Sequence, residues 1–331
     1  MTYCKAPYIN TYINSNGKLY PCCAWQQVHE YDQTTVQAQM QSGEIPLGCS
    51  RCAAQDSAGI DSVRQNWNSE PSVPHAEIAV DNTCNLECVM CSSMFSHRIH
   101  RREIAIYGKP VQPNLLNNNT AWQNINWKQI QHLRLYGGEP TVSTGTTKLL
   151  SHLINTGDIE HIHLVIPTNC AEPPNTVMQT ALSKADSSTI DLSIDAWGEL
   201  NSWQRPGTDW NTTHTVLNTW RRHRDELGCT LTVNCTLTPY NIVATDTLIQ
   251  QINDMHVHIE PVFYPEPFDV RRMPKKLKNT ITVNNHYVNN ILADDQTETN
   301  WQFPQHHQKI VQYYKQDPRH LYPHLIPYLP E

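Results

Sequence analysis

Residues 84–91 read CNLECVMC, which places three cysteines at C-x3-C-x2-C within one short stretch. Thiolates at this spacing, in a loop that leaves a strand, can converge on one soft metal centre. Three ligands leave either a zinc ion or an iron site one partner short, and His97 could supply a fourth ligand to zinc. The stretch therefore predicts a metal centre, which is either a structural zinc site or an iron site with an open position.

Short apolar segments alternate with amphipathic segments around this stretch. The segment EIAV (77–80) comes directly before the cysteines. The candidate strands are residues 77–80, 132–136, 162–166, 190–195, 231–237 and 257–263. The candidate helices between them are residues 143–156, 174–184, 211–227 and 243–254. Strands that alternate with helices predict an α/β fold with a parallel sheet, and six such repeats predict a partial (β/α)6 barrel.

The pattern changes on both sides of this α/β region. Residues 53–74 are polar and end in a proline-containing stretch with Pro71 and Pro74, which is typical of a connector. Beyond residue 268 we expect two helical segments, at about 276–292 and 305–316. The predicted domains are a cysteine-rich module and linker (1–74), the partial barrel (75–268) and a helical C-terminal extension (269–331).

Composition excludes several classes of function. With 24 basic and 31 acidic side chains the net charge is −7, which argues against a surface that binds nucleic acid. No run approaches the roughly 20 apolar residues of a membrane span, and the start MTYCKAPYIN does not resemble a signal peptide. We therefore expect a cytoplasmic protein without a membrane partner. In that compartment the 11 cysteines favour metal or redox chemistry over disulfides.

In the identity and order of its motifs, the region 75–268 resembles the radical S-adenosylmethionine superfamily. Cys84, Cys88 and Cys91 match the motif with which that superfamily binds a [4Fe–4S] cluster, whose open iron is chelated by S-adenosylmethionine. The residue before the last cysteine is often aromatic there and lies near the adenine, whereas here it is Met90. Its thioether can still pack against a ring. The resemblance implies this cluster, S-adenosylmethionine and an external one-electron donor of the flavodoxin or ferredoxin type.

Further matches follow the later strands. Gly137-Gly138-Glu139-Pro140 resembles the superfamily's GGEP motif, whose backbone edge and acidic side chain receive the methionine ammonium. Ser193 and Asp195 resemble fourth-strand positions near the ribose and carboxylate of the cosubstrate, and Thr168-Asn169 stands where the third strand ends. Arg205, in the segment RPG, could bind a carboxylate through two hydrogen bonds or could lie in a solvated turn.

The N-terminal cysteines form a second group. Tyr8 to Ile13 followed by NSNGKLYPCC predicts a β-hairpin with Asn16-Gly17 as its turn. The order of cysteines around this hairpin resembles the twitch and SPASM auxiliary-cluster modules of radical S-adenosylmethionine enzymes, which usually follow the barrel rather than precede it. The resemblance implies the shorter twitch type with one auxiliary [4Fe–4S] cluster. Its expected ligands are Cys4, Cys22, Cys49 and Cys52.

Two alternatives remain open for this N-terminal group. Cys23, next to Cys22, could be the true hairpin ligand. A zinc ribbon is also open, because a hairpin cysteine with a C-x2-C pair is a zinc signature as well. The remaining Cys170, Cys229 and Cys235 lie at strand edges and are expected to be small buried apolar residues.

The resemblance implies reductive cleavage of S-adenosylmethionine to a 5′-deoxyadenosyl radical, which abstracts a hydrogen atom from a substrate. Because enzymes with auxiliary clusters often modify peptides, a peptide or protein substrate is the first hypothesis. The second is oxidation or rearrangement of a small molecule such as an aminosugar, a nucleoside or a cofactor precursor. The third is a non-catalytic zinc-binding protein, which would cleave no cosubstrate. The sequence singles out no catalytic side chain.

Overall fold

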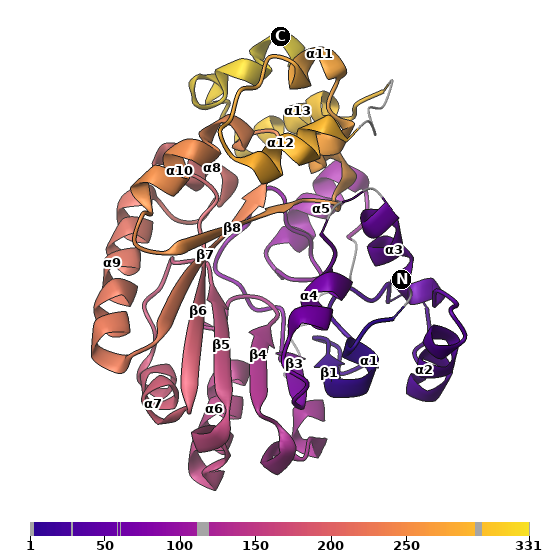
Figure 1. Cartoon of the computed structure of the whole chain (residues 1–331). Helices are drawn as coiled ribbons and strands as arrows, with labels where there is room; N and C mark the ends of the chain where they lie inside the picture. The colour runs from indigo at the N-terminus through magenta and orange to yellow at the C-terminus, as the bar shows by residue number, and fades with distance from the viewer. Residues whose placement is uncertain are drawn as a thin grey trace. The chain divides into compact units, whose positions relative to one another are not determined.

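The computed structural model describes residues 3–27, 29–57, 59, 61–110, 119–294 and 300–330. The chain has an α/β fold with a mostly parallel sheet, whose strand order is β2-β1-β3-β4-β5-β6-β7-β8 (Figure 1). The strands are β1 (Asn10–Ile13), β2 (Leu19–Tyr20), β3 (His75–Ala79), β4 (His132–Tyr136), β5 (His163–Thr168), β6 (Ser187–Ser193), β7 (Thr230–Leu237) and β8 (His256–Pro261). β1 pairs antiparallel with β2, whereas the pairs β1–β3, β3–β4, β4–β5 and β7–β8 are parallel.

Two compact units make up the chain. The first comprises Met1–Asn82, Leu115–Ile166 and Pro174–Thr189, and the second comprises Thr83–Asn114, Pro167–Pro173 and Ile190–Glu331. The helices of the first unit are α1 (Ala6–Ile9), α2 (Gln33–Gln41), α3 (Ser50–Ser57), α4 (Val63–Ser69), α6 (Thr144–Thr156) and α7 (Thr176–Lys184). Those of the second are α5 (Ile99–Tyr107), α8 (Glu199–Gln204), α9 (Trp210–Leu227), α10 (Thr245–Gln251), α11 (Lys275–Lys278), α12 (His286–Ala293) and α13 (Phe303–Tyr314).

Capping side chains begin several of these helices. Ser143 accepts a hydrogen bond from the N–H of Thr146 at the start of α6, and Asp209 accepts one from Thr212 at the start of α9. Such caps satisfy N–H groups that have no partner within the helix. At the other end, Gly157 and Gly228 adopt the left-handed conformation that ends α6 and α9. These local signals agree with the helices predicted at 143–156 and 211–227.

In the first unit, the two faces of the sheet differ in chemistry. Along β4, the buried Leu133 and Leu135 alternate with His132, Arg134 and Tyr136, which are partly buried. Because side chains alternate between the faces of a strand, one face is apolar and the other is polar. The apolar face provides core residues, whereas the polar face places ionisable side chains against one another.

A row of histidines crosses this polar face. His75, His132 and His163 occupy paired positions on β3, β4 and β5, and adjacent ring centroids are 4.6 Å and 4.5 Å apart. Burial and the neighbouring His75 and His163 lower the pKa of His132 to about 3. Protonation of His132 is therefore disfavoured in the folded chain.

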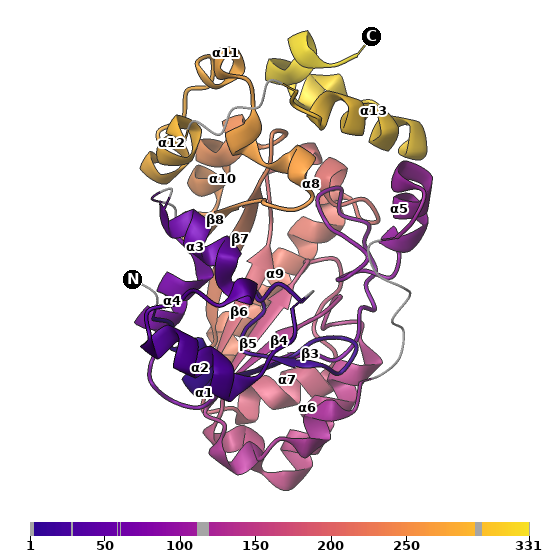
Figure 2. The ribbon, with the colours of Figure 1, turned by 90° about the vertical axis from the view of Figure 1, so that its right-hand side faces the viewer.

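Aromatic side chains form much of the core of the second unit. The buried ring of Tyr240 contacts Phe268, Phe303 and Tyr322, at centroid distances of 6.1, 5.0 and 4.9 Å. The hydroxyl of Tyr240 is 2.8 Å from Nδ1 of His307, which lies on α13. Helix α13 also packs against α5, as Figure 2 shows. The C-terminal segment is thus part of this core.

The six strands predicted in the α/β region are present as β3 to β8, with ends that differ by up to three residues. The segment predicted as one helix at 276–292 is instead two helices, α11 and α12, separated by residues 279–285, of which 280–285 read TITVNN. This separating stretch, TITVNN, is β-branched and polar, so it does not favour a continuous helix. Helix α4 lies within the polar stretch that was interpreted as a connector.

Among the helices of the described residues, none has the length and apolar character of a membrane span.

The lowered pKa of His132 predicts a loss of stability in acid. Because the unfolded chain binds a proton near pH 6.5 while the folded chain resists it to about pH 3, the stabilisation is complete above pH 6.5 and is lost as the pH falls toward 3. In His132→Phe, which keeps an aromatic ring, the free energy of unfolding should fall less between pH 7 and pH 4 than in wild type. Urea unfolding at a series of pH values measures this difference.

His320, whose side chain is 72% exposed, provides the control. His320→Phe should retain the pH dependence of wild type. A His132→Phe chain that loses stability in acid as steeply as wild type would contradict the prediction.

Candidate functional site

The three-cysteine loop, residues 84–91, lies in the second unit between β3 and α5. It has no regular secondary structure, yet Leu86, Val89 and Met90 are buried. The loop is bound to the segment after α8 by two backbone hydrogen bonds, from Glu87 N to Pro206 O (2.8 Å) and from Val89 N to Gln204 O (2.8 Å). The RPG segment therefore supports the loop instead of forming a solvated turn.

Gly207 is required for this close approach. Its φ is +115°, and a Cβ atom there would lie 3.0 Å from both Asn85 O and a side-chain carbon of Leu86. Only glycine adopts this conformation readily and leaves room for the neighbouring backbone.

N–H groups point at two of the loop's sulfur atoms. Cys84 Sγ accepts from the backbone N–H of Leu86 (3.5 Å) and from Nδ2 of Asn169 (3.9 Å). Cys88 Sγ accepts from Nη1 of Arg205 (3.8 Å). Hydrogen bonds of this kind stabilise metal-bound thiolates and tune iron–sulfur clusters. Three thiols in one loop, two of which accept from N–H groups, form a donor set that fits a thiolate-bound cluster.

The free thiols themselves are held in their neutral form. Burial raises the pKa of the Cys88 thiol, and it raises the pKa of Cys91 to about 12. Binding of a metal centre would therefore release protons from the loop.

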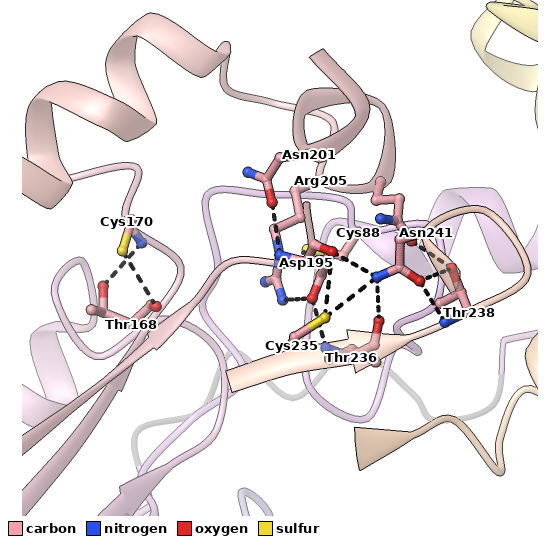
Figure 3. Close-up of polar contacts among 11 residues, drawn as sticks. Cys88, Thr168, Cys170, Asp195, Asn201, Arg205, Cys235, Thr236, Thr238 and Asn241 are labelled. Atoms are coloured by element: carbon pink, nitrogen blue, oxygen red, sulfur yellow. Dashed lines mark hydrogen bonds and ion pairs between the residues drawn. The ribbon is translucent and has the colours of Figure 1, made fainter. Parts of the chain in front are cut away.

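Arg205 and Asp195 form a buried ion pair beside Cys88 (Figure 3). Arg205 Nε lies 2.7 Å from one carboxylate oxygen of Asp195, and Nη2 lies 2.9 Å from the other. Burial alone would lower the pKa of Arg205, but Asp195 and Cys88 outweigh it and raise that pKa above its usual range. The guanidinium of Arg205 therefore binds a carboxylate of the protein itself through two hydrogen bonds.

Asp195 is held in turn by the strand and helix beside it. Its carboxylate accepts from Thr236 N (2.9 Å) and its own N–H donates to Asn201 Oδ1 (2.9 Å). Its carbonyl accepts from Asn241 Nδ2 (2.7 Å) and from the thiol of Cys235 (3.4 Å). Both carboxylate oxygens are therefore engaged within the protein, and Asp195 fixes the position of Arg205.

Asn169 connects the end of β5 to the loop. Besides its contact with Cys84, its Nδ2 donates to Asn85 Oδ1 (2.8 Å), and its Oδ1 accepts from Ala171 N (3.0 Å). The neighbouring Thr168 hydroxyl accepts from Cys170 N (3.4 Å). Of the other predicted residues, Met90 is buried within the loop and Ser193 ends β6 half-buried.

Gly137 to Pro140 lie in the first unit, directly after β4. Gly138 N donates to Asp81 O (3.2 Å), and a Cβ atom on Gly137 would lie only 2.3 Å from the same oxygen. Glu139 is buried, and its carboxylate accepts from the N–H (3.1 Å) and hydroxyl (2.8 Å) of Thr141. The glycines thus allow the chain after β4 to contact the chain after β3.

The N-terminal thiols gather in the core of the first unit. Cys4 and Cys22 pack in one apolar cluster with Trp25 and Trp67, and Cys49 packs against it. Burial raises the pKa of the Cys22 thiol well above its usual range, and the nearby Cys23, Glu77, Cys4 and Cys52 raise it further. Cys4 and Cys52 also lie near Cys49 and raise its pKa in the same direction as burial. Burial raises the pKa of Cys4 to about 11 and that of Cys49 to about 12. The four residues predicted as auxiliary ligands are therefore neighbours.

Cys23 has different partners. Its thiol donates to the hydroxyl of Tyr136 (3.5 Å), and its N–H donates to the buried carboxylate of Glu77 (3.2 Å). Cys23 also packs against the apolar cluster that contains Cys4 and Cys22.

No group of three or more His, Cys, Asp or Glu side chains in the described parts of the chain is arranged to hold a single metal ion. A four-iron cluster separates its cysteines by its own width, so the two kinds of site differ in ligand geometry. His97 Nδ1 accepts from the backbone N–H of Cys84 (3.2 Å). That nitrogen is thus engaged by the loop backbone.

Helix α5 carries loop contacts that the sequence did not single out. The guanidinium of Arg102 donates to the carbonyls of Glu87 (2.6 Å), Cys88 (3.0 Å), Val89 (3.3 Å) and Cys91 (2.9 Å). Glu103 accepts from the N–H of Ser93 (2.8 Å) and from its hydroxyl (2.5 Å). The sequence HRRE presents two adjacent arginines, and no pattern in it distinguishes the buried Arg102 from the exposed Arg101.

No protein-family model matches the sequence, and no curated protein matches it. Three solved structures overlap it in part. The first, anSMEcpe with bound AdoMet and the Cp18Cys peptide, is 15% identical over 62% of this chain and 58% of that chain, with a TM-score of 0.40. The second, Streptococcus suis SuiB bound to S-adenosylmethionine, is 16% identical over 76% of this chain and 49% of that chain, with a TM-score of 0.38. The third, the radical S-adenosylmethionine methyltransferase TsrM from Kitasatospora setae with cobalamin and a [4Fe-4S] cluster bound, is 12% identical over 57% of this chain and 37% of that chain, with a TM-score of 0.35. This chain spans no more than 58% of their lengths. These TM-scores are too low to establish a shared fold.

The close approach at Gly137 predicts a large cost for any side chain there. Gly137→Ala combines a φ of +115° with a Cβ only 2.3 Å from Asp81 O, so we expect a loss of about 3 kcal/mol or more in the free energy of unfolding. Gly157→Ala is the control, because φ is +77° there but no atom lies within 4 Å of the added Cβ. Its expected loss is about 1–2 kcal/mol. Equal losses in the two variants, measured by urea unfolding, would contradict the steric argument.

Proposed function

We propose that the chain is a radical S-adenosylmethionine enzyme, which cleaves its cosubstrate reductively and abstracts a hydrogen atom from a substrate. The observation that carries the proposal is the loop 84–91, which holds three thiols at C-x3-C-x2-C and in which N–H donors point at the sulfurs of Cys84 and Cys88. Cys84, Cys88 and Cys91 would hold a [4Fe–4S] cluster. When bound, that cluster would supply the electron that cleaves S-adenosylmethionine to a 5′-deoxyadenosyl radical.

The roles of the protein's own residues follow from the contacts described above. Asn169 and Arg205 donate to the sulfur atoms and so orient the thiolates. Asp195 keeps Arg205 in place through two short hydrogen bonds. By resemblance, Gly137 to Pro140 would receive the methionine ammonium, and Ser193, Thr168 and Met90 would contact the rest of the cosubstrate. The electron would come from an external donor of the flavodoxin or ferredoxin type.

We assign the N-terminal thiols to a second, auxiliary [4Fe–4S] cluster. The proximity of Cys4, Cys22, Cys49 and Cys52 supports this assignment. Zinc at the same four thiols is the alternative. An auxiliary cluster favours a peptide or protein as the substrate, by resemblance to twitch and SPASM enzymes. Oxidation or rearrangement of a small molecule is the second candidate. A gene for a short precursor peptide next to this one would favour the first, and neighbouring sugar or nucleotide enzymes the second.

The proposed reaction predicts release of 5′-deoxyadenosine. Anaerobic chain loaded with iron and sulfide, then reduced with dithionite, should convert S-adenosylmethionine to 5′-deoxyadenosine and methionine, which liquid chromatography measures. Cys88→Ala should abolish the release because it removes a cluster ligand. Cys229→Ala removes a buried thiol that belongs to none of the predicted motifs, so this variant should retain the release of 5′-deoxyadenosine. Iron-loaded wild type that releases none, or a loop that binds zinc, would refute the proposed function.

The auxiliary assignment predicts iron stoichiometry. Cys49→Ser should bind about four fewer iron atoms per chain than wild type, because it removes one ligand of a four-iron cluster. Cys23→Ala should bind as much iron as wild type, since Cys23 contacts Tyr136 and Glu77 instead. Iron and zinc are counted in anaerobically purified chain by plasma mass spectrometry. Loss of one zinc ion in Cys49→Ser would instead establish a zinc ribbon.

A further inference from the structure

Arg102 is a buried cation with neutral hydrogen-bond partners. Its side chain is 3% exposed, and its guanidinium donates to four loop carbonyls and to the hydroxyl of Tyr314 (3.1 Å). In the part of the chain that the structure describes, no carboxylate lies in an ion pair with it. A buried charge is costly unless an opposite charge compensates it. The arrangement therefore calls for an anion near the loop.

Two other guanidinium groups lie at the loop: Arg98, which donates to Asn85 O (3.0 Å), is exposed to solvent, and Arg205 is already balanced. Arg205 donates to Cys88 Sγ, but Asp195 neutralises its charge through two hydrogen bonds. Glu103, the carboxylate next to Arg102 in the sequence, accepts hydrogen bonds from the N–H (2.8 Å) and the hydroxyl (2.5 Å) of Ser93. The carboxylate of Glu87 reaches Arg102 only through Tyr314, whose hydroxyl is 3.3 Å from it. Of the two buried guanidinium groups at the loop, Arg102 is therefore the one without a carboxylate in an ion pair among the described residues.

A thiolate-bound cluster would supply the missing negative charge. Three thiolates around an oxidised four-iron core carry one net negative charge, and reduction by one electron adds another. A fixed positive charge nearby stabilises the more negative state, so it raises the reduction potential. The same guanidinium also binds the carbonyls of Glu87, Cys88, Val89 and Cys91, which fixes the backbone that carries Cys88 and Cys91.

We propose that Arg102 is the positioning residue that fixes the cysteine loop around its iron–sulfur cluster and balances the cluster's charge. This inference rests on the proposed function and assigns a role that the sequence motifs did not contain. Tyr314 extends the arrangement to the C-terminal segment, because its hydroxyl also lies 3.0 Å from Glu87 O. Helix α13 thereby contacts the loop as well as α5, beside which it lies in Figure 2.

The test compares Arg102→Gln with Arg101→Gln, which removes the same charge from an exposed position on the same helix. Each chain is loaded anaerobically with iron and sulfide, and the iron that Cys88→Ala fails to bind defines the share held by the loop. In Arg102→Gln we expect the loop's iron to be bound roughly 10- to 100-fold more weakly, as chelator competition measures. A redox titration followed by electron paramagnetic resonance should give a more negative midpoint potential. Arg101→Gln should match wild type in both measurements.

The outcomes separate the two proposals. Wild type that holds no iron at the loop refutes the proposed function. Wild type that holds iron, together with an Arg102→Gln chain that matches Arg101→Gln in retention and potential, refutes only the role of Arg102. A purely structural role would lower the melting temperature of iron-free and iron-loaded chain equally and leave the potential unchanged, which also overturns the inference.

If Arg102→Gln does not fold, Arg102→Lys tests the proposed role of Arg102. It keeps the charge but lacks the planar fork that reaches several carbonyls at once. We expect a potential close to that of wild type with faster loss of iron to the chelator. Unchanged iron loss in Arg102→Lys overturns the inference.

Discussion

An irregular loop that is buried must find partners for its peptide groups within the protein, and this constraint governs the structure around residues 84–91. The loop's N–H groups donate to the carbonyls of Gln204 and Pro206, and several of its carbonyls accept from Arg102. Neither Arg102 nor the pair Gln204 and Pro206 is adjacent to the loop in the sequence. Gly207 makes the hydrogen bonds to Gln204 and Pro206 possible, because a side chain there would meet the loop backbone. Hydrogen bonds to the loop backbone thus fix the segment that carries the three cysteines, without any contribution from a metal.

The charges around this frame are arranged in two different ways. Arg205 is paired with Asp195 and presents one remaining N–H to Cys88, so it contributes a directed hydrogen bond with little net charge. Arg102 has only neutral acceptors and contributes net charge as well as geometry. Bidentate guanidinium pairs fix direction, whereas an unbalanced buried cation favours an anionic occupant. Together they make the loop suited to a negatively charged thiolate centre.

Much of the α/β region could be predicted from the sequence. The six strands and the helices α6, α7 and α9 have clear apolar patterns and capping residues, and the structure contains them with small shifts at their ends. The contacts of the loop could not be predicted in the same way. Nothing in the sequence HRRE indicates that Arg102 is buried. The sequence RPG is as compatible with a solvated turn as with a segment that packs against the cysteine loop. Both features depend on tertiary contacts. Helix α4, with the sequence VRQNWNS, was also missed because only its Trp67 is apolar and buried.

The attachment of the N-terminal segment to the sheet also depends on tertiary pairing. The strand β1 was expected within a hairpin, but its parallel pairing with β3 joins residues more than sixty positions apart. That pairing places Asn10 against the buried Glu77, to which its Nδ2 donates (2.9 Å). The same carboxylate accepts from Cys23 N, so the sheet and the N-terminal cysteines share one set of contacts. Local patterns predict the hairpin, whereas its neighbour in the sheet is set by packing.

The most direct test of the central claim is Mössbauer spectroscopy of the Cys49→Ser chain loaded anaerobically with isotopically enriched iron, before and after addition of S-adenosylmethionine. This variant isolates the loop from the proposed auxiliary site. The account predicts the spectrum of a four-iron cluster, in which one iron becomes distinct from the other three when the cosubstrate binds. A mononuclear metal at the loop, or a cluster whose spectrum S-adenosylmethionine does not change, would contradict it.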